Sequence, residues 1–195
     1  SLFLLLFLFL LYFNKKGTSN IINMVFFLKL PFFFERNLFF IKYKIKFFSM
    51  IYKNIKNILI LAKDNLFPIA LEGALKIKEL SYIHAEAVCA GEIKHGTMAL
   101  LDCYYLVILL ISNDSNYLNM ISCLREVKLR YANIIVICRE NDSIISSIIN
   151  DIIEIKYDNY FFSPILYSLP LQLFALYISL YNNKDIDYPR NLAKS

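Results

Sequence analysis

From Lys53 onward, short apolar runs alternate with longer segments that have the length and periodicity of helices. Four runs have the composition of buried parallel strands: 57–62 (NILILA), 104–111 (YYLVILLI), 134–138 (IIVIC) and 151–155 (DIIEI). Three other segments predict helices: 69–83 (opened by Pro68), 117–130 and 164–181. Strands alternating with helices favour an α/β fold of three layers, α/β/α, around a parallel sheet. Such folds bind ligands at the carboxyl ends of their strands.

Residues 1–50 follow a different pattern, in which apolar and aromatic residues are interspersed with lysines. We predict two helices joined by a loop at 14–20, and we interpret Gly17-Thr18-Ser19 as an interhelical turn rather than a phosphate loop. The uncharged segment 1–13 is shorter than the roughly 20 apolar residues of a membrane span. The basic residues Lys15 and Lys16 follow this apolar run, whereas a signal peptide has its basic residues before the apolar run. A buried helix is therefore favoured, with a membrane anchor as the alternative.

These patterns divide the chain into three parts. Residues 1–50 form a helical remnant or linker, residues 51–182 form one α/β domain, and residues 183–195 form a polar tail. A chain of 195 residues is long enough for one domain with a substantial core, but it is short for a two-domain enzyme.

Composition narrows the possible functions. Hydrophobic residues make up 58% of the chain, and Phe, Ile, Tyr, Asn and Lys are the residues of AT-rich codons, so the net charge of +5 is a weak signal. The lysines are scattered and lack the clustered arginines of a nucleic-acid-binding face, so no nucleic-acid partner is expected. The four cysteines form no C-x-x-C pair, which favours reduced thiols in a cytoplasmic protein over disulfides or a metal site.

One short segment contains both of the chain's histidines, which can transfer protons, and three of its glycines, which can adopt unusual backbone conformations. Both histidines, His84 and His95, fall within residues 73–96, together with Gly73, Gly91 and Gly96. In a chain with only four glycines, this grouping indicates that the segment needs particular backbone conformations and a titratable side chain.

The predicted helix before this segment carries three charged residues on one face. Glu72, Lys76 and Glu79 are spaced i, i+4 and i+7, so their side chains project from the same side of the helix. Taken alone, the spacing is most often that of a solvent-exposed ion pair. We predict that the three side chains point toward the strand ends rather than into bulk solvent.

Two longer strings carry a resemblance to a known family. Residues 70–96 read ALEGALKIKELSYIHAEAVCAGEIKHG, and residues 185–195 read DIDYPRNLAKS. Both resemble the second sugar-isomerase (SIS) lobe and the C-terminal tail of the isomerising glutamine–fructose-6-phosphate aminotransferases, which make glucosamine 6-phosphate. Pro68 and the Pro170-Leu171-Gln172-Leu173 segment match as well, and the resemblance covers about residues 54–195. The match is specific because its motifs lie far apart in the chain.

The resemblance implies an SIS fold and a role for several residues. It implies that Glu79 shuttles a proton between C1 and C2 of the opened sugar, and that Lys76 positions the sugar and the glutamate. His95 is implied to assist ring opening across a dimer interface. Lys194 is implied to form a Schiff base with the ketose carbonyl. A carboxylate and an amine of this kind suit a ketose-to-aldose conversion.

The resemblance also implies further substrate-binding residues and the partners of the chain. Glu72 and Ala193 are implied to bind substrate, and His84 is assigned a hydrogen-bonded structural role. No cofactor and no metal are implied. The implied partners are a sugar phosphate and either a second copy of the chain or a complementary chain with the glutaminase and first SIS lobe; no membrane partner is expected. We do not expect Lys194 to be positioned for catalysis in this chain alone, because little ties down a polar terminal tail.

The chain departs from the family pattern in several places. The family's L-G-R-G turn is Leu61-Ala62-Lys63-Asp64 here, a change that a turn with positive φ would resist, and the proline after K-H-G is Thr97. The glutaminase domain and the phosphate-binding loops of the first lobe have no counterpart, so we expect a truncated or split enzyme. Two alternatives remain: a non-catalytic SIS module that senses a sugar phosphate, and a small membrane protein with an apolar N-terminus.

Overall fold

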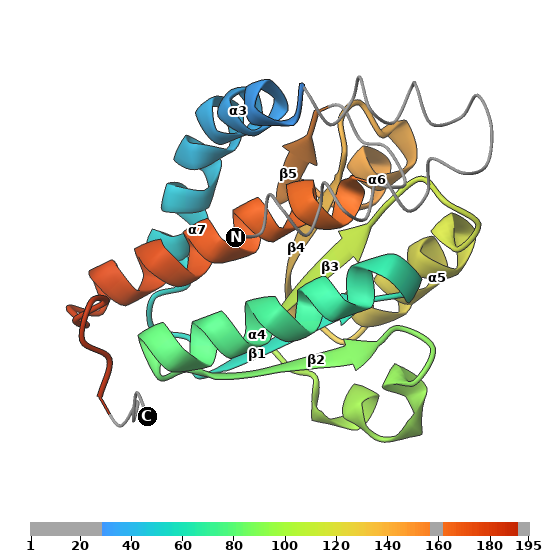
Figure 1. The fold of residues 1–195 in the computed structure, drawn as a ribbon. Coiled ribbons are helices and arrows are strands. Elements are labelled where there is room, and N and C mark those ends of the chain that lie inside the picture. Colours follow the sequence, from blue (N-terminus) through green and yellow to red (C-terminus); the bar gives the residue numbers. More distant parts are fainter. Residues whose placement is uncertain (1–28, 157–161, 191–195) are drawn as a thin grey trace, which may run out of the picture.

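A five-stranded, fully parallel sheet forms the centre of the molecule (Figure 1), and its strand order is β2-β1-β3-β4-β5. The computed structural model describes residues 29–156 and 162–190. The strands are β1 (Asn57–Ala62), β2 (His84–Cys89), β3 (Tyr105–Ile111), β4 (Asn133–Arg139) and β5 (Ile152–Ile155). The helices are α3 (Leu30–Ile51), α4 (Phe67–Ser81), α5 (Tyr117–Lys128), α6 (Ser143–Ile148) and α7 (Ser163–Tyr181). Short 3₁₀ turns are η1 (Asp64–Leu66), η2 (Ile93–His95) and η3 (Thr97–Leu100).

The sheet separates two apolar cores, which confirms the predicted three-layer fold. On one side, α3, α4 and α7 pack against alternate strand residues such as Ile58 and Ile60 (Figure 1). On the other side, α5 and α6 pack against the intervening residues such as Leu59 and Leu61. Because successive side chains of a strand point to opposite faces, a strand covered on both sides is apolar at every position. This is why β1, β3 and β4 were recognisable as continuous apolar runs.

The strand β2 is the one strand of the described sheet that the sequence pattern missed. It pairs only with β1 among the described strands, so it lies at the edge of the sheet. Its residues His84 and Glu86 are exposed, whereas Ala85 between them is buried. An edge strand with one wet face alternates polar and apolar residues, and six residues of HAEAVC are too few to make that alternation distinctive.

The helix α3 joins the same core as the sheet. Its buried face includes Phe33, Ile41 and Ile45. The fully buried Asn37 donates from Nδ2 to the carbonyls of Phe33 (2.9 Å) and Lys156 (3.0 Å), and its Oδ1 accepts from the Lys156 amide (2.8 Å). These bonds fasten α3 to the end of β5. The helix predicted within residues 1–13 and the turn at Gly17-Thr18-Ser19 lie outside the described residues.

The helix α7 is apolar on nearly all sides because it is largely covered. Within the described residues it is the one helix long and apolar enough to cross a membrane, but 56% of that window is buried. Tyr167 donates its hydroxyl to the Ile111 carbonyl at 2.9 Å, and Leu171 and Phe174 lie in the core shared with the sheet. Its contacts with α3 and α4 are those of a core helix.

The packing of α4 on α7 requires a residue without a side chain at position 73. A Cβ atom on Gly73 would lie 2.5 Å from Leu171 Cδ1 and 3.1 Å from Leu171 Cβ. Gly73 is buried in the middle of α4, where glycine is otherwise unfavourable by roughly 1 kcal/mol relative to alanine. The glycine therefore serves a close approach of two helices.

We predict that Gly73→Ala lowers the free energy of unfolding by about 1–3 kcal/mol, because overpacking outweighs the gain in helix propensity. Urea denaturation followed by circular dichroism measures the change. Gly91→Ala is the matched control, since a Cβ there meets nothing within 4 Å. A Gly73→Ala chain as stable as the unchanged protein would contradict the tight contact.

Candidate functional site

The predicted charged cluster of α4 forms as a connected set of ion pairs. Lys76 Nζ lies 2.9 Å from Glu79 Oε2 and 3.7 Å from Glu72 Oε1, so the predicted common helix face is confirmed. Glu79 has the least exposed side chain of the three, at 25%. The hydrogen bond to Glu79 is the largest cause that raises the pKa of Lys76 above its ordinary value. Lys76 therefore stays protonated at neutral pH and faces two carboxylates.

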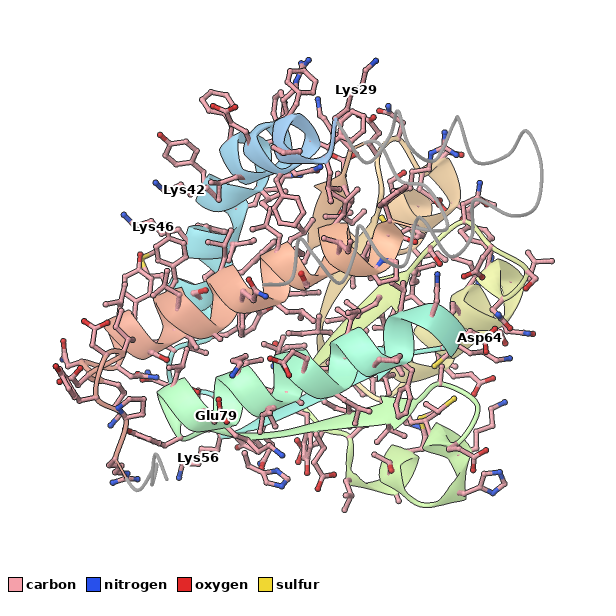
Figure 2. All side chains as sticks on the ribbon, viewed as in Figure 1. Lys29, Lys42, Lys46, Lys56, Asp64 and Glu79 are labelled. Carbon is pink, nitrogen blue, oxygen red and sulfur yellow. The ribbon has the colours of Figure 1, made fainter. Side chains whose placement is uncertain are left out.

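Glu79 lies beside the amino ends of the strands, opposite to the carboxyl ends where such folds bind ligands. The prediction that the three side chains point away from bulk solvent is wrong for Glu72 and Lys76, whose side chains are 48% and 38% exposed. The helix α4 starts after β1 has ended and runs back, so Glu79 lies two residues before the helix ends at Ser81. Figure 2 shows Glu79 at the same end of α4 as Lys56, which precedes β1, with Asp64 at the opposite end. The i, i+4, i+7 spacing shows that the side chains share one face of the helix, but it does not show which ends of the strands they lie beside.

His95 does not join the cluster within one chain. It ends η2, beyond the carboxyl end of β2, and it is exposed. A strand of six residues spans roughly 20 Å, so the length of β2 separates His95 from the end of α4 that carries Glu79. Gly96 follows with φ of 138°, a conformation that favours glycine. His84 lies at the other end of β2, where its Nε2 is 3.4 Å from Glu86 Oε1.

The C-terminal tail is held against the end of α4, and our expectation that little ties it down is wrong as far as Arg190. The Arg190 amide donates to the Tyr82 hydroxyl at 2.7 Å, and the Arg190 guanidinium lies 4.2 Å from the centre of the Tyr82 ring. Tyr82 directly follows α4, three residues after Glu79. Nothing in the residues around Tyr82 marked it as a tail contact. Ala193 and Lys194 lie outside the described residues.

The turn after β1 keeps the backbone geometry that its sequence change called into question. Asp64 has φ of 48°, in the left-handed region, at the place of the family's second glycine. Aspartate tolerates this region better than most residues. The Asn116 side-chain amide donates to Asp64 Oδ2 and so ties this turn to the loop after β3.

The same loops give the carboxyl edge of the sheet a negative character between β1 and β3. This position is the switch point of the strand order 2-1-3-4-5, where folds of this type bind phosphate-bearing ligands. Here Asp64 and Asp114 contribute two carboxylates, and Asp114 accepts from Ser112 Oγ (2.5 Å) and the Asn116 amide (2.7 Å). Lys63, next to Asp64, offsets one of these charges, so the two loops keep a net negative charge that disfavours a phosphate.

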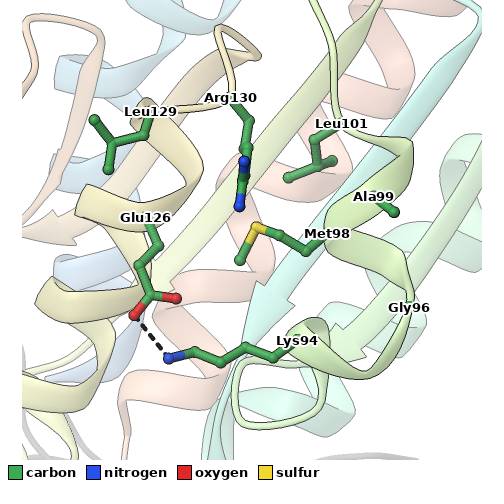
Figure 3. Close-up of a pocket in the computed structure, with 8 residues that line it drawn as sticks. All are labelled: Lys94, Gly96, Met98, Ala99, Leu101, Glu126, Leu129 and Arg130. Carbon is green, nitrogen blue, oxygen red and sulfur yellow. Dashed lines mark hydrogen bonds and ion pairs between the residues drawn. The ribbon is translucent and has the colours of Figure 1, made fainter.

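A pocket of about 750 Å³ lies beside the turn that carries His95 (Figure 3). Met98 and Leu101 line it from the η3 side, and Glu126 and Arg130 line it from α5 and the turn that follows. Lys94 closes one end through an ion pair of 2.8 Å with Glu126. None of Glu72, Lys76 and Glu79 reaches this pocket. Among the described residues, no group of three or more His, Cys, Asp or Glu could hold a metal ion.

Comparison with known proteins identifies the class to which this fold belongs. The family model for the SIS domain matches residues 51–181, and the chain belongs to this family. It is similar to the glutamine–fructose-6-phosphate aminotransferase [isomerizing] of Escherichia coli K12, with 44% identity over 137 residues, 70% of this chain and 22% of the relative. The same enzyme of Wigglesworthia glossinidia brevipalpis is 36% identical over 182 residues, 93% of this chain and 29% of the relative.

A solved structure supports the same assignment. The C-terminal domain of glucosamine-fructose-6-phosphate aminotransferase from Francisella tularensis superposes with a TM-score of 0.80 and 28% identity, covering 90% of this chain and 49% of that one. The resemblance expected from the helix and tail motifs is thereby confirmed. The chain spans less than a third of the length of the curated relatives described above.

We predict that Asp64→Gly and Asp64→Val differ clearly in their effect on the free energy of unfolding. Glycine accepts the left-handed conformation, so Asp64→Gly changes the unfolding free energy by less than about 1 kcal/mol. A β-branched residue resists it, so Asp64→Val destabilises by about 1–3 kcal/mol. Chemical denaturation measures both, and equal stability of the two variants would show that the turn does not need a positive φ.

Proposed function

We propose that this chain is the isomerase lobe of a glutamine–fructose-6-phosphate aminotransferase, acting in the cytoplasm on fructose 6-phosphate. The observation that carries the proposal is the Glu79–Lys76 pair at the end of α4 where the tail is anchored through Arg190. The four residues from Arg190 to Lys194 extend by at most about 14 Å. Lys194 is therefore kept within reach of that helix end.

Each residue has a defined task in the proposed reaction. The Lys194 amine bonds to C2 of the open ketose and water leaves, which gives an imine. Ammonia then displaces the lysine and takes its place at C2. Glu79, as a carboxylate, removes a proton from C1 and returns it to C2, while the proton of the C1 hydroxyl passes to the nitrogen on C2. C1 thereby becomes the carbonyl carbon of the aldose glucosamine 6-phosphate. Lys76 holds the Glu79 carboxylate in place and, together with Glu72 and Ala193, contacts the sugar.

In this proposal, the groups that bind the sugar phosphate and the domain that releases ammonia lie outside this lobe. Asp64 and Asp114 make the switch-point edge unsuited to a phosphate. The relatives are more than three times as long as the matched region. We infer that a glutaminase and a first SIS lobe complete the enzyme, either earlier in the same polypeptide or as a separate chain.

His95 fits a contribution to the site of a second copy. It lies at the edge of the sheet opposite to Glu79, so one copy does not unite the two. A homodimer in which the exposed η2 turn reaches its partner's cluster would do so. The positive φ of Gly96 shapes this turn.

A non-catalytic sensor of sugar phosphates is the second candidate. It would need the SIS fold and a phosphate site but neither the Glu79–Lys76 pair nor an imine-forming lysine. The negative switch-point edge disfavours it. The membrane-protein alternative rests on residues 1–13, which lie outside the described residues. Within the described residues, the one helix apolar enough to cross a membrane, α7, is packed against α3 and α4.

We predict that glucosamine 6-phosphate forms from fructose 6-phosphate and glutamine only when this chain is mixed with a separately expressed glutaminase-plus-first-lobe chain. In that mixture Glu79→Gln lowers kcat by roughly 10²–10⁴-fold, because the proton carrier is lost. Glu86→Gln, on the exposed edge of β2, is the matched control and leaves kcat unchanged. Product from this chain alone with glutamine would refute the proposal, as would full activity of Glu79→Gln.

The outer face of α3 offers a surface for the first lobe. Phe39, Tyr43, Phe47 and Met50 follow helical spacing and are all exposed, Tyr43 at 75%. An apolar stripe of this extent indicates a covered face. Because this chain covers only 29% of the Wigglesworthia relative, and α3 precedes the SIS match that begins at residue 51, we assign this stripe to the proposed first lobe.

We predict that Phe39→Asp combined with Tyr43→Asp weakens binding to the first-lobe chain at least about tenfold, because a charge replaces apolar contact. Isothermal calorimetry measures the affinity. Tyr131→Asp, at an equally exposed aromatic after α5, is the control. Unchanged affinity of the α3 variant would exclude this face as the contact.

A further inference from the structure

Tyr82 gathers three groups from the C-terminal tail around one side chain. Its hydroxyl accepts the Arg190 backbone N–H at 2.7 Å. The Arg190 guanidinium lies 4.2 Å from the ring centre, and the Lys184 ammonium lies 5.7 Å from it. Cations within about 6 Å of an aromatic centre are attracted to the face of the ring. Residues 184 and 190 are therefore both held by a residue more than a hundred positions earlier in the chain.

The backbone of Tyr82 is held in place, so its side chain can anchor the tail. Its amide donates to the Lys78 carbonyl at 3.1 Å, and its φ of 60° turns the chain out of α4 toward β2. On one side Ser81 is buried and bonded to the Ile77 carbonyl, and on the other His84 pairs with Asn57. The residue is thus held between a helix end and a strand start.

The tail itself is folded between its two attachment points. Asp185 Oδ1 accepts the amides of Asp187 and Tyr188, both at 3.0 Å, which forms a turn. At the end of α7, Asn182 donates from Nδ2 to the Lys53 carbonyl at 2.9 Å. The segment therefore leaves α7 at a fixed place, turns once and reaches Tyr82.

We propose that Tyr82 is a positioning residue that clasps Lys184 and Arg190 and thereby confines the imine-forming Lys194 beside Glu79. The inference rests on the proposed function of Lys194. With the clasp, Lys194 lies four residues beyond its anchor at Arg190; without it, the last anchor is the bond from the Lys184 amide to the Ser179 carbonyl, ten residues before Lys194. Effective concentration falls roughly as the −3/2 power of the free length, so the clasp raises the local concentration of the Lys194 amine about fourfold.

The attachment itself is tested without any catalysis, on the full 195-residue chain. Limited trypsin digestion followed by mass spectrometry gives the rate of cleavage after Arg190, with cleavage after the exposed Arg130 as the internal reference. We expect cleavage after Arg190 to accelerate at least fivefold in Tyr82→Leu and less in Tyr82→Phe, which keeps the ring but loses the hydroxyl acceptor. Tyr188→Leu, which alters the 84% exposed tyrosine of the same tail, is the control.

The chemical consequence is tested by reductive trapping. Fructose 6-phosphate and borohydride are added to the chain together with the glutaminase-plus-first-lobe chain, and labelling of Lys194 is followed over time. We expect Tyr82→Leu to slow labelling about fourfold with an unchanged unfolding midpoint, and Tyr82→Trp, which restores an aromatic face, to recover most of the rate.

The two measurements separate the possible failures. Equal cleavage after Arg190 in all variants would overturn the clasp. Faster cleavage in Tyr82→Leu, with Lys194 of the unchanged chain never labelled, would uphold the clasp and overturn the proposed role of Lys194. Faster cleavage with undiminished labelling would show that Tyr82 holds the tail but does not position the lysine.

Discussion

The close approach of α4 and α7 at Gly73 is the contact on which both the core and the candidate site depend. The N-terminal part of α7 lies by the carboxyl edge, where Tyr167 binds the Ile111 carbonyl, and its C-terminus lies by the amino edge, where Asn182 binds the Lys53 carbonyl. Both helices therefore run from the carboxyl edge to the amino edge and end on the same side of the sheet (Figure 1). The tail leaves α7 beside the end of α4 that carries Glu79. A larger side chain at position 73 would move α7, and with it the start of the tail.

The sequence predicted four of the five strands, among them the edge strand β5, and missed the edge strand β2. Strands β1, β3 and β4 are covered on both faces, so burial makes every position apolar and visible as a run. The edge strand β2 has one exposed face, and its short alternation resembled a loop. The short helix α6 has only six residues, with Asp142 accepting the Ile145 amide at its start, and its apolar content is too small to give a period.

The residues of the candidate site could be predicted from the sequence, but their location in the fold could not. Helical spacing put Glu72, Lys76 and Glu79 on one face, and the ion pairs follow from that alone. Their position at the amino edge depends on the direction in which α4 returns along the sheet. The contact between Tyr82 and Arg190 joins segments far apart in the chain, and no local pattern encodes such a pair. Distant contacts of this kind are decided by the packing of whole helices.

The turn at Asp64 keeps a left-handed backbone conformation although its sequence differs from the family's glycine-rich turn. The left-handed conformation persists without glycine because aspartate tolerates it and because Asn116 bonds to its carboxylate. The same carboxylate adds negative charge at the switch point, which disfavours a phosphate there. The backbone of the turn is therefore compatible with the SIS fold. The opposite edge of the sheet carries the Glu79–Lys76 pair and the anchored tail, and the proposed function assigns proton transfer and imine formation to that edge. The chemistry proposed for this lobe therefore depends on its amino edge, whereas the phosphate site is proposed for another lobe.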